Sequence, residues 1–68
     1  MNTALRWTDV TDIALALVER HADVDPRYLS FPDLYRWILA LPDFGDDPSR
    51  CNERVLEAVQ GAWLAEMD

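Results

Sequence analysis

This 68-residue chain has no lysine, only one cysteine and only two glycines. The single thiol, Cys51, cannot close an intramolecular disulfide, and no Cys/His set has the spacing of a zinc site. A domain of this size is near the lower limit at which one apolar core folds unaided. We therefore expect its stability to come from side-chain packing alone, and its location to be a reducing cytoplasm.

The chain also lacks a long uncharged apolar run and an apolar secretion signal at its amino terminus. These two absences predict a cytoplasmic, soluble protein with no membrane span.

Basic residues are few, because six arginines face thirteen acidic residues and the formal net charge is -7. The arginines are spread along the chain, so there is no phosphate-binding patch. Affinity for DNA or RNA comes largely from Lys and Arg that neutralise phosphates, so this composition argues against nucleic acid. It favours a basic protein partner or hard cations.

Turn signals divide the chain into three helical segments, which predicts an all-α, three-helix domain over residues 1–68. The first helix is expected from about Asp9 to His21, with Thr8 as its N-cap. Its apolar side is formed by Val10, Ile13, Ala14, Leu17 and His21.

A short turn is expected to start at Asp25-Pro26, and a second helix to follow the Ser30 cap and end at Pro42. Its core face is Leu34, Trp37, Ile38 and Leu41.

A third helix is expected to start at Asp47-Pro48, after a Gly45 with positive φ, and to reach about Glu66. Its buried face is expected to be Val55, Leu56, Val59, Trp63 and Met67. Residues 5–7 could instead form a short extended segment.

Four carboxylates on the first helix follow steps close to whole turns: Asp9, Asp12, Glu19 and Asp23. A solvated helix face is one interpretation. However, like charges at this spacing repel, and only Arg20 borders the stripe. The alternative interpretation is a docking face for a cationic partner.

A second acidic group is Asp43, Asp46 and Asp47 in the loop 43–48. Asp47 is expected to be a helix cap and Asp43 a turn residue, which leaves Asp46 without a local role. The spacing does not match a calcium loop of the EF-hand kind. Carboxylates and water could hold Fe2+, Mn2+ or Mg2+ only weakly here.

The remaining chemistry-bearing residues do not form a catalytic set. His21 is expected to be a partly buried residue at a helix end, and Cys51 has no base beside it in sequence. Trp37 and Trp63 are expected in the core, whereas the position of Trp7 is open. Two aromatic residues are candidates for exposure: Tyr35, beside Asp33, and Phe44, which is equally compatible with packing under its loop.

Several segments, in this order and spacing, resemble the IscX (YfhJ) family of bacterial iron-sulfur cluster assembly. They are Leu5-Arg6-Trp7-Thr8-Asp9, Asp23-Val24-Asp25-Pro26, Phe31-Pro32-Asp33-Leu34-Tyr35-Arg36-Trp37-Ile38, Asp43-Phe44-Gly45-Asp46-Asp47-Pro48, Asn52-Glu53 and Trp63-Leu64. The resemblance covers nearly the whole chain, and the ordered set is more specific than any one piece.

The resemblance implies a winged-helix-like helical domain that is not an enzyme. It also implies binding to the cysteine desulfurase IscS, competition there with bacterial frataxin, and iron uptake through acidic residues. The family's acidic motif positions correspond to Asp9, Asp23, Asp25, Asp33, Asp43, Asp46 and Asp47, with Asp12 and Glu19 as further acidic positions. Gly45 replaces a common aspartate, which removes one carboxylate from the loop, and Pro32 stands where a Thr cap is common.

We therefore expect a monomeric adaptor for IscS that binds iron weakly, as Fe2+ or alternatively Fe3+. The expected partner-binding residues are Asp9, Asp12, Glu19, Asp23, Asp33 and Tyr35. The expected metal-binding residues are Asp43, Asp46, Asp47, Asp9 and Asp12. An Fe2+ donor to the assembly scaffold is the alternative, and a DNA-binding regulator is a third hypothesis that the net charge opposes.

Overall fold

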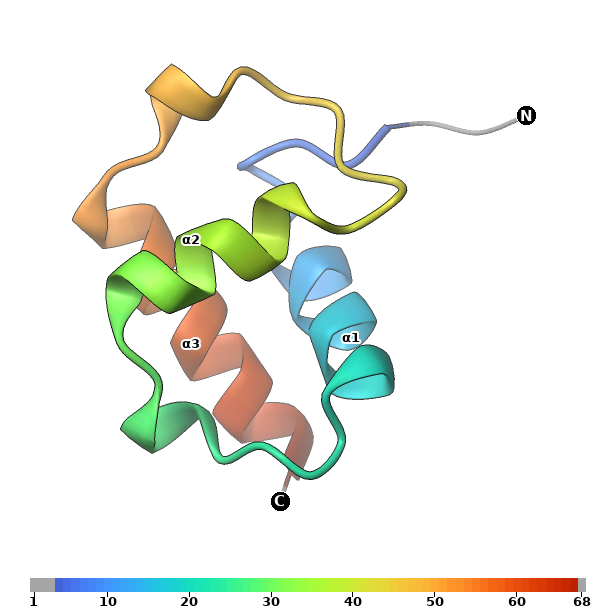
Figure 1. Cartoon of the computed structure of the whole chain (residues 1–68), viewed down its shortest axis with the longest axis vertical. Coiled ribbons are helices and arrows are strands. Elements are labelled where there is room, and N and C mark those ends of the chain that lie inside the picture. Colours follow the sequence, from blue (N-terminus) through green and yellow to red (C-terminus); the bar gives the residue numbers. More distant parts are fainter. Residues whose placement is uncertain (1–3, 68) are drawn as a thin grey trace.

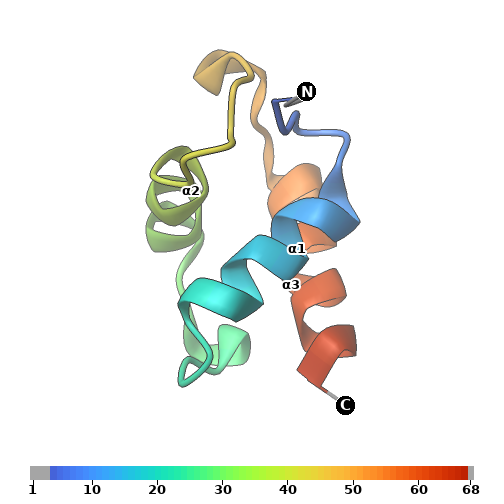
Figure 2. The ribbon, with the colours of Figure 1, turned by 90° about the vertical axis from the view of Figure 1, so that its right-hand side faces the viewer.

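Three α-helices and two 3-10 turns form the protein in a computed structural model that describes residues 4–67. Their order is α1 (Val10–Arg20), η1 (Pro26–Tyr28), α2 (Phe31–Leu39), η2 (Pro48–Arg50) and α3 (Glu53–Met67). In Figure 1, α2 crosses in front of α3 and α1 lies beside them. Figure 2 shows α2 on one side of the molecule and α1 with α3 on the other, and α1 and α3 make the most extensive contact between helices.

The all-α class is confirmed, whereas the winged-helix-like topology is not. Within residues 4–67 the only β-type pairing is one parallel bridge between Leu5 and Phe44. It is closed by two hydrogen bonds, from Leu5 N to the Asp43 carbonyl oxygen at 2.7 Å and from Gly45 N to the Leu5 carbonyl oxygen at 2.9 Å. The extended piece near residues 5–7 is thus limited to a bridge that holds the amino-terminal segment against the acidic loop.

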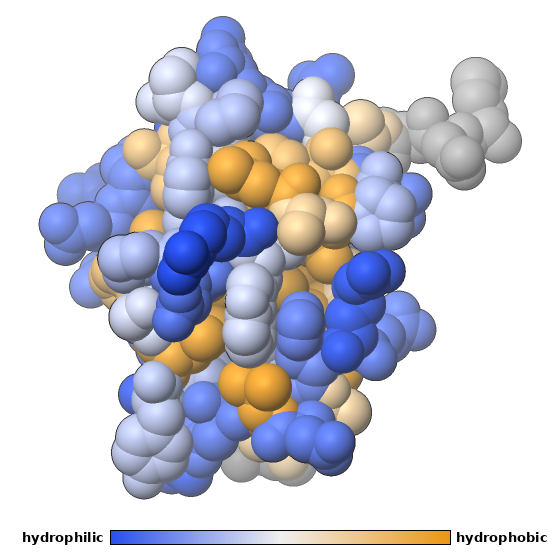
Figure 3. All heavy atoms as spheres, viewed as in Figure 1, coloured by the Kyte–Doolittle hydropathy of each residue, from blue (hydrophilic) through white to orange (hydrophobic). Residues whose placement is uncertain are grey.

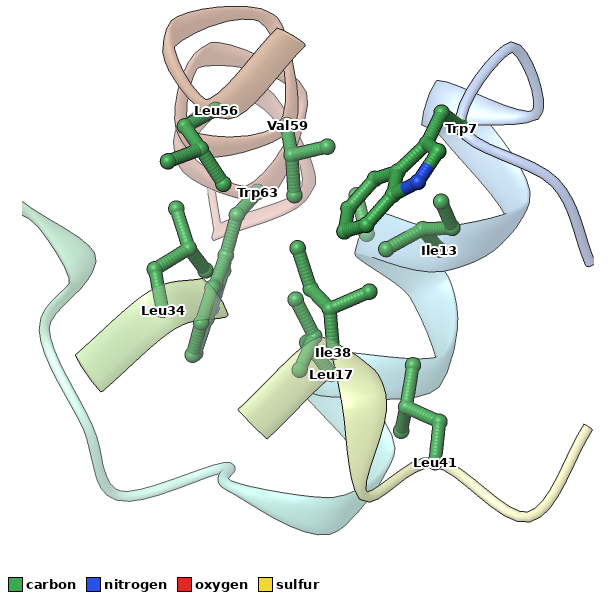
Figure 4. Close-up of a cluster of buried hydrophobic side chains, with 10 residues drawn as sticks. Trp7, Ile13, Leu17, Leu34, Ile38, Leu41, Leu56, Val59 and Trp63 are labelled. Carbon is green, nitrogen blue, oxygen red and sulfur yellow. The ribbon is translucent and has the colours of Figure 1, made fainter. Parts of the chain in front are cut away.

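A single apolar core receives side chains from all three helices and from the segment before α1. Its buried members are Trp7, Ile13, Ala14, Leu17, Leu34, Ile38, Leu41, Leu56, Val59 and Trp63. Figure 4 shows these side chains converging between the helices, with Trp7 beside the start of α1. Their periodicity matches the predicted faces of α1 and α2, except that Val10, His21 and Trp37 are only half-buried. Val55 of α3, which was expected to be buried, is also only half-buried. Met67 was also expected in the core, but it is 48% exposed because it lies in the last turn of α3, beyond the packed helices.

The predicted helix starts are correct for α2 and wrong by one residue for α1. Ser30 caps α2, and its hydroxyl accepts from Asp33 N at 3.3 Å. The N-cap of α1 is Asp9 rather than Thr8. The Asp9 carboxylate does not cap the helix itself; it turns back and accepts from Arg6 N at 2.9 Å.

The start of α3 was predicted five residues too early. Asp47 and Pro48 do form a cap and a first helical residue, but of the 3-10 turn η2, which ends at an extended Cys51. The carboxamide of Asn52 then accepts from Val55 N at 2.9 Å and satisfies the first turn of α3. Two short capped pieces therefore replace one continuous helix.

Gly45 does not have the positive φ that was expected. Its role is a close approach, because a Cβ atom there would lie 2.5 Å from the Cβ of Ala4.

No helix within the described part of the chain is both long and apolar enough to span a bilayer.

Candidate functional site

The carboxylates of α1 lie on its solvent side, as the sequence predicts. Asp12 and Glu19 are exposed on the helix, and Asp23 is exposed in the turn that follows. Asp9 is half-buried because it closes the turn before the helix. Three of the four predicted positions are thus open to a partner, and the fourth has a structural role.

Few of the acidic side chains are neutralised by arginine. Within residues 4–67 the ion pairs are Arg27 with Asp25, at 2.7 Å, and Arg36 with Asp33. The side chains of Asp12, Glu19 and Asp23 have no ion-pair partner among the described residues. The surface of α1 therefore keeps a surplus of negative charge.

A shallow hollow is lined by one carboxylate from each of the two acidic groups of the sequence, Glu19 and Asp43, together with Arg20. It has a volume of about 130 Å³, and its lining residues are Leu5, Ala16, Glu19, Arg20, Leu41, Pro42 and Asp43. Glu19 comes from α1, whereas Asp43 comes from the loop that the bridge to Leu5 holds in place. The acidic face defined by Asp12, Glu19, Asp23 and Asp43 is therefore assembled from two separate segments.

Leu15 is an exposed apolar residue on the same helix that sequence reasoning missed. It lies three residues after Asp12 and four before Glu19, and it is 41% exposed. Its position off the buried stripe of Ile13 and Leu17 is the signal that could have identified it. On the face that carries α2, Figure 3 shows apolar patches separated by hydrophilic side chains.

Asp46 has a local role, contrary to the prediction. Its Oδ2 accepts from Trp7 N at 3.0 Å and its Oδ1 accepts from Asp47 N at 2.7 Å. Hydrogen bonds from these two amides, the Trp7 amide first, hold the pKa of the Asp46 carboxyl below its usual value. Both oxygens are thus committed to holding the loop against the amino-terminal segment.

Asp47 is similarly engaged, since its Oδ1 accepts from Ser49 N at 2.9 Å and from Ser49 Oγ at 2.8 Å. These bonds lower the pKa of the Asp47 carboxyl. Its carbonyl oxygen accepts from the indole Nε1 of Trp7 at 2.8 Å. The loop therefore holds Trp7 by two hydrogen bonds, one from its backbone N–H to the Asp46 carboxylate and one from its indole N–H to the Asp47 carbonyl oxygen.

Trp7, whose position was open, lies in the core with 3% of its surface exposed. Tyr35 stacks on it with ring centroids 6.1 Å apart, and Phe44 packs edge-on at 4.6 Å. Tyr35 is only half-buried, and its hydroxyl donates to the Pro48 carbonyl oxygen at 3.4 Å. The aromatic residues expected at the surface thus support the loop, although part of Tyr35 stays accessible.

The structure does not assemble the predicted metal ligands into one cluster. Among residues 4–67, no three Asp, Glu, His or Cys side chains are placed to hold a metal ion. The five expected ligands, Asp43, Asp46, Asp47, Asp9 and Asp12, are therefore not a preformed site. The hydrogen bonds of Asp46 and Asp47 explain part of this result, because they direct the carboxylates toward backbone amides.

His21 and Cys51 have the structural positions that the sequence indicates. The imidazole of His21 stacks on Trp37 with centroids 4.0 Å apart, and burial followed by the charge of Arg20 lowers its pKa. Burial raises the pKa of the Cys51 thiol, which makes it a poorer nucleophile at neutral pH.

A model of the iron-sulphur cluster assembly family matches residues 5–68. The chain belongs to this family, which is the IscX family. A similar protein is an uncharacterized protein of Pseudomonas aeruginosa, 55% identical over 65 residues, which cover 96% of this chain and 98% of the relative. Membership places this protein in iron-sulfur cluster assembly.

Proposed function

We propose that this protein is an acidic, non-catalytic adaptor that binds the cysteine desulfurase IscS and thereby modulates iron-sulfur cluster assembly. The observation that carries the proposal is the unpaired charge of the acidic face. Asp12, Glu19, Asp23 and Asp43 are exposed, and none has an arginine partner among the described residues. A cationic surface on the desulfurase would supply the missing countercharges.

Leu15 gives this face an apolar centre. Rim charges mainly accelerate encounter and select the partner, whereas a buried apolar side chain adds affinity. Leu15 lies between Asp12 and Glu19 along α1, so one docking event would desolvate it while the two carboxylates meet basic groups. Competition with bacterial frataxin for the same desulfurase surface is part of the proposal, as are a monomeric state and a cytoplasmic location.

The test is a calorimetric titration of the full chain into the IscS holoenzyme at increasing NaCl. We expect a saturable complex whose affinity falls at least several-fold between about 20 mM and about 150 mM NaCl, because salt screens charges at the rim of the interface. The absence of a complex at the lowest salt would end the proposal.

Two double variants with equal charge change locate the surface. Asp12→Asn with Glu19→Gln should weaken the complex about tenfold or more, whereas Glu53→Gln with Glu57→Gln should change it by less than about threefold. All four residues are exposed, so both proteins should fold. Equal losses would move the interface away from α1.

Weak Fe2+ binding is a separate part of the proposal. Because the described residues do not present three convergent ligands, we expect Fe2+ to associate loosely with the acidic face rather than to be retained. This expectation favours the adaptor over the Fe2+ donor. Calorimetry that finds tight Fe2+ binding at physiological salt, abolished by Asp43→Asn, Asp46→Asn and Asp47→Asn together, would reverse that preference.

A further inference from the structure

A groove between the amino-terminal ends of α1 and α3 differs in character from the acidic face. It has a volume of about 430 Å³, and its lining residues are Trp7, Thr8, Val10, Asp46, Arg50, Arg54, Val55 and Ala58. This volume is within the range of small-ligand and peptide side-chain pockets. Figure 4 shows Trp7, which lies along the groove, beside the start of α1 and facing α3.

The charged groups of this groove are mainly cationic. Arg50 and Arg54 have no ion-pair partner among residues 4–67, although the whole chain has a net charge of -7. The one acidic lining residue is Asp46, whose two oxygens already accept the amides of Trp7 and Asp47. The groove is therefore lined by two guanidinium groups and by one carboxylate whose oxygens already accept hydrogen bonds from backbone amides.

A third arginine lies close by. Arg6 lines the adjoining hollow together with Arg50, Asp46 and Asp47. The charges of Arg50 and Arg6 help to lower the pKa of the Asp46 carboxyl, although neither arginine forms an ion pair within residues 4–67. Glu53 and Glu57 do not line either hollow, although they are neighbours of Arg54 in sequence. Three of the six arginines are thus gathered beside the groove, where they outnumber the two nearby carboxylates, Asp46 and Asp47, which already accept hydrogen bonds.

We propose that this groove binds an extended segment of a partner protein in which an apolar side chain is followed by a carboxylate. The apolar side chain would lie against Val10, Val55 and Ala58, and the carboxylate would accept the paired N–H groups of a guanidinium. This surface is independent of the acidic face and suits a partner of opposite charge. The protein could then contact a basic and an acidic partner at the same time.

The test uses an amide NMR titration of the full chain with a blocked hexapeptide of sequence Gly-Leu-Asp-Leu-Glu-Gly. We expect saturable shifts at Trp7, Val10, Val55 and Ala58, with a Kd of about 0.1–1 mM. The same peptide with Asn and Gln in place of Asp and Glu should bind at least about fivefold more weakly. An equally tight neutral or lysine-containing peptide, or no saturable shift, would overturn the proposal.

Two variants and a matched control assign the binding to this groove. Arg50→Gln with Arg54→Gln should reduce affinity for the acidic peptide about tenfold, whereas Arg20→Gln with Arg36→Gln, which changes the net charge equally, should leave it within about twofold. Ala58→Phe keeps both arginines and should block the groove sterically. Equal losses in the two arginine pairs, or unchanged binding to Ala58→Phe, would refute the assignment.

Discussion

Single residues in this protein have roles that depend on which groups they contact. Asp46 and Asp43 are separated by two positions, yet Asp46 accepts two backbone amides while the side chain of Asp43 is exposed beside Glu19. Asp43 is therefore available to a partner, and Asp46 supports the fold. A charge count of the loop cannot make this distinction.

His21 is the only histidine of the chain, so any change of stability that arises from histidine protonation comes from this one side chain. Its pKa is lowered in the folded protein, chiefly by burial, so the unfolded chain binds the proton more readily. Stability should be fully present above the ordinary histidine pKa of 6.5 and should fall as pH decreases toward the folded pKa.

Thermal melts between about pH 7.5 and pH 5 measure this effect, and carboxylates with lowered pKa values contribute only at more acidic pH. We expect His21→Gln to flatten the profile over this range. A wild-type melting temperature that rises on acidification would contradict the lowered pKa.

All the helical elements except α1 begin at a side-chain cap, and the separate caps of η2 and α3 explain the break before α3. Asp47 caps η2 through Ser49, and Asn52 caps α3 through Val55. Cys51 between them is extended, so the chain changes direction before α3 begins. This change of direction places Arg50 beside Arg54 along the groove.

The cap of α3 gives a prediction at this scale. Asn52→Ala should lower the free energy of unfolding by about 1 kcal/mol, because Val55 N loses its acceptor. Asn52→Asp should retain most of the stability, since a carboxylate accepts the same bond and is favoured at a helix amino terminus. Urea unfolding of the three proteins measures the difference, and equal stability of Asn52→Ala and wild type would show that the cap contributes little.

The whole molecule combines a compact core with a net charge of -7. Self-repulsion of a surplus charge opposes the compact state, whereas the same charge promotes encounter with a cationic partner. Salt should therefore act in opposite directions on folding and on docking.

Raising NaCl from about 10 mM to about 200 mM should increase the melting temperature of the free protein while it weakens the complex with IscS. Scanning calorimetry and the salt-dependent titration provide the two measurements. If both quantities fell with salt, the loss of affinity would be explained by a weaker fold rather than by screening of the interface.

Local patterns in the sequence determined the number of helices, most of their apolar faces and the sign of the surface charge. They also determined two caps: Ser30 before α2, and Asp25, whose side chain accepts from Arg27 N at the start of η1. These features depend on residues a few positions apart, whose spacing and chemistry act within one turn. The tertiary structure alone decided that Trp7 is buried, that Asp46 holds it from 39 residues away, and that Glu19 and Asp43 line one hollow. It also decided the groove of Arg50 and Arg54, because contacts between distant segments follow from how the helices pack and have no signature in local spacing.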